Sequence, residues 1–255
     1  NAHAQALVRA TTDTVGVVVH DVGDPYFAEI IRGIQQSAAE AYRLMIVCNS
    51  YRDPQRELEY VRLLQMQRVE AIILAGSGLD ERGYSRAMIE QLDSFVEMGG
   101  RVAVIGRHYV AADAVLPDNA GGARALARLL LDRGHRCFGV IDGPALLTTS
   151  RDRRDGFVQT LAEAGITLPP DAIEPGDFTR DGGARAALAL LQRHPSISAV
   201  FALNDVMAIG ALAALRRQGI DVPGQVSLVG FDDIPIAADV TPALTSVRVP
   251  MNQLG

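Results

Sequence analysis

The alternation of short apolar runs with amphipathic stretches constrains the fold of this chain more than any other feature. Residues 15–19 form an unbroken apolar run, and Phe27, Ile30 and Ile34 then recur at helical spacing. Strands that are apolar throughout are typical of parallel sheets covered by helices on both faces. Further runs of this kind lie at 44–47, 71–74, 102–105, 138–141, 199–203 and 226–230. We therefore predict an α/β fold.

The pattern restarts once, after Leu116-Pro117, so we expect two Rossmann-like lobes, each a parallel sheet sandwiched by helices. The 255 residues, of which 48% are apolar, suffice for two such cores. Local signals place helix boundaries within the series. Asp53-Pro54 is typical of a helix start, and Gly99-Gly100 is typical of a helix end.

Several classes of chemistry are excluded by composition. The 24 positive residues are all Arg, so neither a phosphate-binding loop ending in Gly-Lys-Ser/Thr nor a Schiff-base lysine is possible. The five histidines have no metal-ligand spacing, and the glycine motifs of serine hydrolases and dinucleotide-binding proteins are missing. We therefore expect no enzyme, no metal site and no cofactor.

The apolar runs, the cysteines and the first residues indicate where the protein acts and whether the chain is part of a longer one. No run approaches the ~20 apolar residues of a membrane span, so we expect no membrane partner. Cys48 and Cys137 lie in apolar runs, and we expect two buried thiols of a cytoplasmic protein without a disulfide. Because the chain opens at Asn1 without a basic and apolar leader, we expect a piece of a longer protein.

Polar and aromatic residues follow the apolar runs, where open α/β sheets bind their ligands. Carboxylates, carboxamides and arginines together offer the donors and acceptors that a hydroxyl-rich ligand needs. An Asp or Asn at such a position can instead be only a helix N-cap. We expect the two sets to face each other across a cleft between the lobes. The candidate effector-binding residues are Asp21, Tyr26, Phe27, Ser77, Arg107, Arg153, Phe178, Asn204 and Asp232.

Short motifs in a fixed order make the chain similar to the effector-binding core of the LacI/GalR family of bacterial transcription regulators. The resemblance covers nearly the whole chain. The motifs are DPYF at 24–27, RGHR at 133–136, RRDGF at 153–157, GDF at 176–178, ND at 204–205, VGFDD at 229–233 and PALTSVR at 242–248.

The resemblance implies a fold like that of type I periplasmic binding proteins and gives roles to individual residues. It implies that Arg153, Asn204 and Asp232 hydrogen-bond the effector, and that Phe178 stacks on it. Tyr26 and Phe27 would lie in a loop that closes over the ligand. The usual Asn of the first motif is Asp24 here, and its negative charge argues against an anionic effector unless Arg153 and Arg107 offset it.

The resemblance also implies an organisation and a mechanism. Residues 1–12 would be the remnant of a hinge helix and linker, with Leu7 as an apolar wedge in the DNA minor groove. Residues 13–118 with 248–255 would form the N-terminal lobe, and 119–247 the C-terminal lobe. The protein would act in the cytoplasm as a homodimer that binds operator DNA through a missing helix-turn-helix headpiece.

The effector and the wider class of protein remain open at this stage. A sugar fits the polar and aromatic set best, and a purine or another metabolite is the alternative. A periplasmic sugar-binding protein of a transporter would share the fold and is the second hypothesis. The residues encoded upstream of Asn1 would separate the two, since a regulator needs a helix-turn-helix there and a transporter component an export signal.

Overall fold

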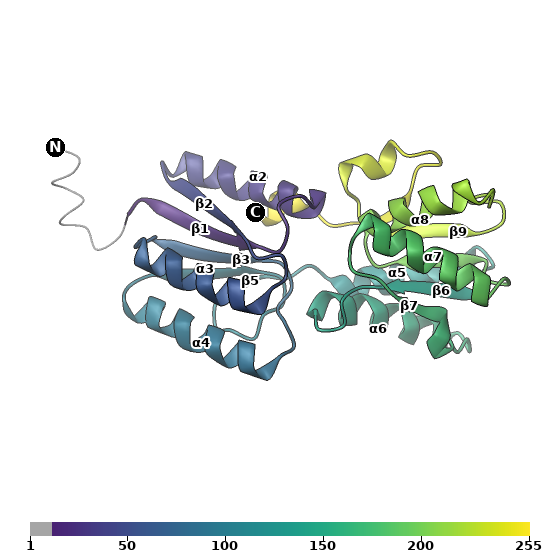
Figure 1. Ribbon diagram of the computed structural model, residues 1–255, viewed down its shortest axis with the longest axis horizontal. Coiled ribbons are helices and arrows are strands. Elements are labelled where there is room, and N and C mark those ends of the chain that lie inside the picture. Colours follow the sequence, from purple (N-terminus) through teal and green to yellow (C-terminus); the bar gives the residue numbers. More distant parts are fainter. Residues whose placement is uncertain (1–11) are drawn as a thin grey trace. The chain divides into compact units, whose positions relative to one another are not determined.

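The computed structural model describes residues 12–255, which form two compact units (Figure 1). Unit 1 extends to Pro117 and takes in Pro250–Gly255, and unit 2 is Asp118–Val249, so the chain passes between the units twice. The second passage comes two residues later than the sequence suggested, because Arg248 ends a strand that pairs inside unit 2. Leu7 and the expected hinge helix lie outside the described residues.

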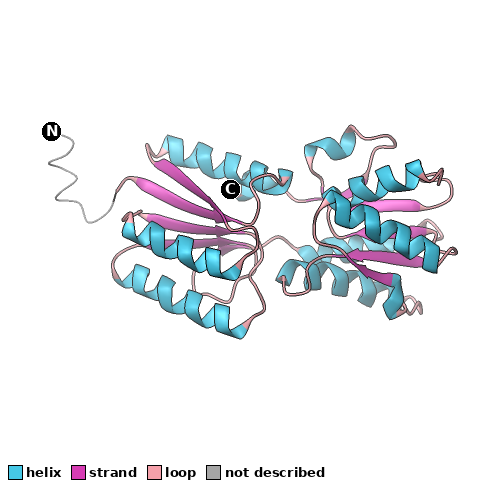
Figure 2. Cartoon of the chain, in the orientation of Figure 1, coloured by secondary structure: helices cyan, strands magenta, loops and turns pink. Residues whose placement is uncertain are grey.

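Unit 1 is built on a five-stranded parallel sheet in the order β2-β1-β3-β4-β5. Helix α2 lies on one side of this sheet and α3 and α4 on the other (Figures 1 and 2). The elements in chain order are β1 (Thr14–Val19), α2 (Pro25–Glu40), β2 (Leu44–Asn49), α3 (Pro54–Met66), β3 (Ala71–Ala75), α4 (Arg82–Glu97), β4 (Arg101–Ile105), β5 (Asp113–Val115) and α9 (Met251–Leu254).

Unit 2 has a second parallel sheet, in the order β10-β9-β8-β6-β7, with α5 packed on α6 and α7 on α8. The predicted α/β class with two parallel sheets is confirmed. The elements are α5 (Asn119–Asp132), β6 (Phe138–Asp142), α6 (Thr148–Glu163), η1 (Pro170–Ala172), β7 (Ile173–Pro175), α7 (Arg180–Arg193), β8 (Ala199–Ala202), α8 (Asp205–Arg217), β9 (Ser227–Asp232), η2 (Pro235–Ala238) and β10 (Thr245–Arg248).

The helix boundaries follow the predicted chemistry. The Asp53 side chain accepts hydrogen bonds from the amides of Gln55 and Arg56, and Pro54 occupies the first helical position of α3. Gly99 follows the C-cap of α4 with φ +91°, a left-handed conformation that glycine adopts without steric cost. Both predicted signals are therefore confirmed.

Unit 2 has an aromatic core beside its sheet. Phe157 of α6 lies between Phe138 of β6 and Phe201 of β8, with ring centroids 6.0 and 4.9 Å away. The ring of Phe231 continues the row at 6.5 Å from Phe201. Such aromatic contacts add to the hydrophobic burial and fix the strands against α6.

Two expectations about burial were wrong. The strand at 44–47 is not covered on both faces: β2 is an edge strand, and the Leu44 side chain is 75% exposed. Cys48, on the same strand, is only partly buried. Cys137 is exposed, because it precedes β6 and so lies outside the covered part of the sheet.

Candidate functional site

Arg153 is the centre of a buried polar network in unit 2. Helix α6 carries its side chain, which is 3% exposed, to the carboxyl ends of the strands. Its Nε donates a hydrogen bond to Asn119 Oδ1 at 2.9 Å, and its Nη1 donates to the Leu203 carbonyl at 2.7 Å. Its Nη2 donates to Asp232 Oδ1 at 2.7 Å, which makes a buried ion pair. The network joins α6, the start of α5 and the ends of β8 and β9.

The guanidinium of Arg153 also stacks on an aromatic ring. Its central carbon lies 3.8 Å from the centroid of the Phe231 ring. Gly122 leaves room for this ring, because a Cβ there would lie 2.8 Å from Phe231 Cζ. A cation on a ring face is stabilised electrostatically, the more so when water is excluded. Arg153 is therefore held in one orientation before any ligand arrives.

Asn204 caps a helix, which is the alternative to ligand binding that the sequence alone could not exclude. It is the N-cap of α8, and its Oδ1 accepts a hydrogen bond from the Met207 amide at 2.9 Å. Its side chain is nearly buried, and among residues 12–255 its Nδ2 group donates no hydrogen bond. The capping bond fixes the carboxamide and leaves that donor available.

Phe178 and a second ion pair lie near the end of β6. Phe178 has a left-handed backbone, φ +61°, and its ring packs over Gly143, where a Cβ would overlap it. Asp142 accepts hydrogen bonds from the Gly143 amide and from Arg154 Nη1, both at 2.9 Å. Ser150 Oγ is buried in the same region without a hydrogen-bond partner among the described residues. The sequence singled out only Phe178 of this group as an effector contact.

The unit 1 candidates also lie at the carboxyl ends of their strands, and their environments differ. Phe27 is almost fully buried, with Tyr26 packed edge-on at 5.1 Å. Asp21 follows β1 and accepts a hydrogen bond from the Gly23 amide, which is a local turn contact. Ser77 is buried after β3, and Arg107 is exposed after β4. Asp21, Ser77 and Arg107 thus follow strands, as predicted, whereas Tyr26 and Phe27 lie in the first turn of α2 and not in the loop that the resemblance implied.

Sequence reasoning missed a buried ionisable cluster at this edge of unit 1. Tyr84 donates a hydrogen bond to Glu57 Oε2 at 2.8 Å, and His20 Nε2 lies 3.8 Å from Glu57 Oε1. Burial raises the pKa of Glu57 to about 7, although the bond from Tyr84 lowers it. Burial also lowers the pKa of His20 to about 3, assisted by Arg52 and His108. His20 is therefore neutral at physiological pH.

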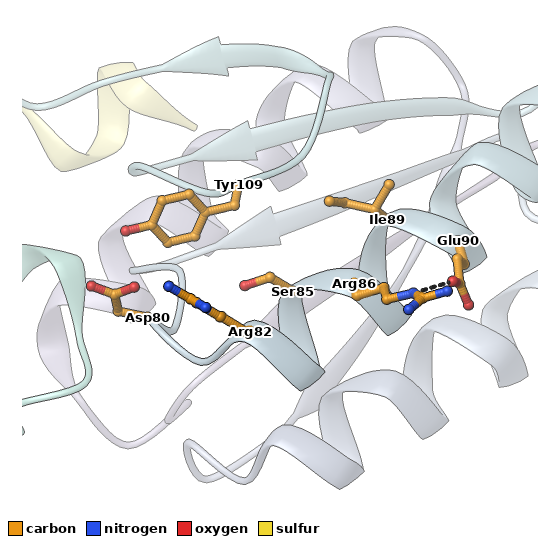
Figure 3. A pocket seen from close by; sticks show the side chains of 7 residues that line it. All are labelled: Asp80, Arg82, Ser85, Arg86, Ile89, Glu90 and Tyr109. Carbon is orange, nitrogen blue, oxygen red and sulfur yellow. Dashed lines mark hydrogen bonds and ion pairs between the residues drawn. The ribbon is translucent and has the colours of Figure 1, made fainter.

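A further hollow of about 490 Å³ lies beside α4 and contains none of the predicted site residues (Figure 3). Arg86 crosses part of its wall to reach Glu90, with an N–O distance of 2.9 Å. Both of these side chains are exposed, and Tyr109 is 41% exposed. Within residues 12–255 there is no group of three metal-ligating side chains and no helix long and apolar enough to span a membrane.

Comparisons with known proteins agree on one family. The model of "periplasmic binding proteins and sugar binding domain of LacI family" matches residues 12–255. The regulator GalS of Salmonella typhimurium is 36% identical, over 98% of this chain and 72% of that protein. GalR of Escherichia coli is 32% identical, over 98% of this chain and 71% of that protein. Among solved structures, the transcriptional regulator CelR in complex with cellobiose is 30% identical with a TM-score of 0.84, covering 96% of this chain and 75% of that one.

Proposed function

We propose that this chain senses an uncharged sugar. It belongs to the family of periplasmic binding proteins and LacI-type sugar-binding domains, and it is the effector-binding domain of a transcriptional regulator. Arg153, Asn204 and Asp232 of unit 2 would hydrogen-bond the hydroxyl groups of the sugar, and Phe178 would stack on its ring. The relatives matched over nearly the whole chain are regulators, so a transporter component is not favoured. Contacts of Asp21, Tyr26, Phe27, Ser77 and Arg107 with the same ligand stay a prediction.

The charge balance around Arg153 is the observation that supports an uncharged ligand. Arg153 is paired with Asp232, and Arg154 is paired with Asp142 and Asp155. Neither arginine therefore offers an uncompensated positive charge to a phosphate or carboxylate. A guanidinium has five N–H donors, and the three bonds of Arg153 leave two for ligand hydroxyls. The Nδ2 group of Asn204 adds another donor.

A thermal-shift series tests this ligand class. D-galactose, cellobiose, glucose 6-phosphate and adenosine would each be added to the wild-type chain and to Asp232→Asn, which keeps the shape of the side chain. We expect a neutral sugar to raise the melting temperature by about 5 °C or more at ~100 Kd, where binding adds ~2.7 kcal/mol. Asp232→Asn should lose that shift. A larger shift with glucose 6-phosphate or adenosine than with either neutral sugar would refute the proposal.

LacI-family regulators bind small-molecule effectors and, as full-length proteins, operator DNA. For this protein we propose a cytoplasmic repressor whose headpiece is encoded upstream of Asn1, with Leu7 in the hinge. An effector that prefers one conformation shifts the equilibrium by its difference in affinity. A coupling of ~1–3 kcal/mol would change operator affinity roughly 5–150-fold. An export signal in place of a helix-turn-helix in the upstream sequence would contradict this assignment.

We also propose a homodimer in which the β2 edge of the unit 1 sheet contributes to the contact. Tyr42 and Leu44 are 94% and 75% exposed, beside the outer edge of β2, and Ile46 of the same strand is also exposed. An unpaired apolar edge strand is suited to association with a second copy. Leu44→Asp should shift sedimentation toward the monomer. Met98→Asp, an equally polar change at another exposed apolar position of unit 1, is the control. Unchanged sedimentation of Leu44→Asp would exclude this edge.

A further inference from the structure

We propose that Asp205 is a positioning residue for effector recognition, because its carboxylate fixes the turn that presents Asp232 to Arg153. The sequence includes Asp205 in the motif at 204–205 but gives it no role of its own. The proposal rests on the proposed function for its consequence in binding, whereas its structural part concerns unit 2 alone.

The Asp205 carboxylate is hydrogen-bonded to one backbone amide of the turn directly and is linked to another through the hydroxyl of Ser246. Asp205 is fully buried, and its Oδ2 accepts a hydrogen bond from the Ile234 amide at 2.9 Å. Its Oδ1 accepts a hydrogen bond from Ser246 Oγ at 2.7 Å. Ser246 Oγ in turn accepts a hydrogen bond from the Asp233 amide at 3.0 Å. The two amides that follow Asp232 are thus both tied to one carboxylate.

The turn needs such support because its backbone is unusual. Asp232 has φ +109° and Asp233 has φ +56°, and non-glycine residues rarely adopt positive φ. Strained conformations persist when surrounding contacts determine them, and they concentrate at functional sites. Here the turn follows β9 directly, where the Asp232 carboxylate meets Arg153 Nη2 at 2.7 Å. Release of the turn would move the acceptor of this ion pair.

Neighbouring residues make room for the carboxylate. Gly230 of β9 faces Asp205, and a Cβ at Gly230 would overlap Asp205 Oδ1. Gly230 is also the register partner of Ser246 on β10. Helix α8 and strands β9 and β10 therefore meet at this one carboxylate, which takes the space that a side chain at Gly230 would fill.

The electrostatics of Asp205 argue against a purely stabilising role. Burial raises its pKa to about 6, although the bonds from Ser246 and Ile234 and the charge of Arg153 oppose the rise. The charge of Asp233, which itself pairs with Arg248 at 2.9 Å, adds to it. A raised pKa means that folding disfavours the ionised form, so the ionisation of Asp205 lowers global stability as pH rises from 3.8 to about 6, and the loss persists above that. Its benefit is local, at the turn.

The alternative is that Asp205 only stabilises the start of α8 through the helix dipole. Asp181 offers a matched control, because it lies in the first turn of α7, is exposed and is also acidic. Asp205→Asn and Asp181→Asn therefore each remove one negative charge from the first turn of a helix. Ser246→Ala removes the hydrogen bonds of Ser246 Oγ to Asp205 and from the Asp233 amide, and leaves the direct bond from the Ile234 amide to Asp205. Ser246→Thr restores a hydroxyl.

Nuclear magnetic resonance on the whole chain gives a readout that needs no ligand. In Asp205→Asn and Ser246→Ala we expect amide hydrogen exchange at Asp233 to be at least about tenfold faster, and the Arg153 Nε–H resonance to move. Ser246→Thr should restore both toward wild type. If Asp205→Asn does not fold, the comparison of Ser246→Ala with Ser246→Thr tests the proposal by itself. Exchange and resonance unchanged in these variants, or changed equally by Asp181→Asn, would overturn the proposal.

Calorimetric titration with cellobiose then separates this inference from the proposed function. If the wild-type chain binds cellobiose, Asp205→Asn should bind it at least about tenfold more weakly, while Asp181→Asn should bind normally. Equal affinity in Asp205→Asn and wild type would refute the positioning role and leave the proposed function intact. If the wild type binds no sugar of the thermal-shift series, the proposed function fails, and the exchange experiment still decides whether Asp205 holds the turn.

Discussion

Replacing Glu57 by Gln should change how the stability of unit 1 depends on pH. Glu57 is 2% exposed, and its burial raises its pKa from the ordinary 4.5 to about 7. The folded carboxyl group thus holds its proton to higher pH than the unfolded one, so this group reduces stability as pH rises. The rise from 4.5 to about 7 corresponds to roughly 3 kcal/mol in total. Most of this loss of stability falls between pH 5 and 8.

Urea unfolding followed by tyrosine fluorescence measures this effect in unit 1 alone. The six tyrosines all precede Pro117 and the chain has no tryptophan, so the signal comes from this unit. We expect the stability of wild type relative to Glu57→Gln to fall by roughly 2–3 kcal/mol from pH 5 to 8. Glu59→Gln, an exposed glutamate on the same helix, should run parallel to wild type.

A further variant checks the origin of the effect. The hydrogen bond from Tyr84 lowers the Glu57 pKa, so Tyr84→Phe should move the pH-dependent loss to higher pH. His20 titrates with the opposite sign, because burial lowers its pKa to about 3 and its stabilising contribution grows from there to pH 6.5. If wild type and Glu57→Gln show the same pH dependence between pH 5 and 8, burial of an ionised Glu57 is not costly and the reasoning is wrong.

Packing gives three further expectations, each measured by calorimetric or urea unfolding. Gly230→Ala should destabilise by ~1–3 kcal/mol, because its Cβ overlaps Asp205 Oδ1; a neutral result would mean that Asp205 moves freely. Gly83→Ala should instead stabilise by ~0.4–1 kcal/mol, because a Cβ there meets nothing within 4 Å; a loss would reveal strain at the start of α4. Phe157→Ala should cost ~3–5 kcal/mol, since the ring is fully buried in the aromatic core; a cost below ~1 kcal/mol would mean that the core refills the cavity.

Sequence reasoning succeeded where the signal is local. Apolar runs located the long strands, and Asp53 and Gly99 marked helix ends, because capping involves only neighbouring residues. Strand β5 was missed because its three residues are exposed and form no apolar run. The exposure of Leu44 was missed for a different reason, since an edge strand and a central strand can share the same apolar composition.

Sequence reasoning was also limited for the side-chain contacts of the candidate site. The family motif identified Arg153, but its bond to Asn119 and its stacking on Phe231 depend on how distant segments meet. The contact between Glu57 and Tyr84 joins two helices, and neither residue belongs to a motif that we recognised. Such pairs require the tertiary structure, because the chemistry of a single Glu or Tyr fits a surface position equally well.

Under the proposed function, the Arg153 network would contribute to effector affinity and not to switching. Its hydrogen bonds, ion pair and ring contact are all made inside unit 2, so their desolvation cost is met during folding and not on ligand binding. A sugar hydroxyl then adds to donors that are already oriented, which favours affinity and stereochemical selection. A ligand changes a conformational equilibrium only through contacts whose strength differs between the two states. Under the proposed function, a network that stays the same in both states would hold the effector without deciding the response, and the switch would depend on contacts that the effector makes outside it.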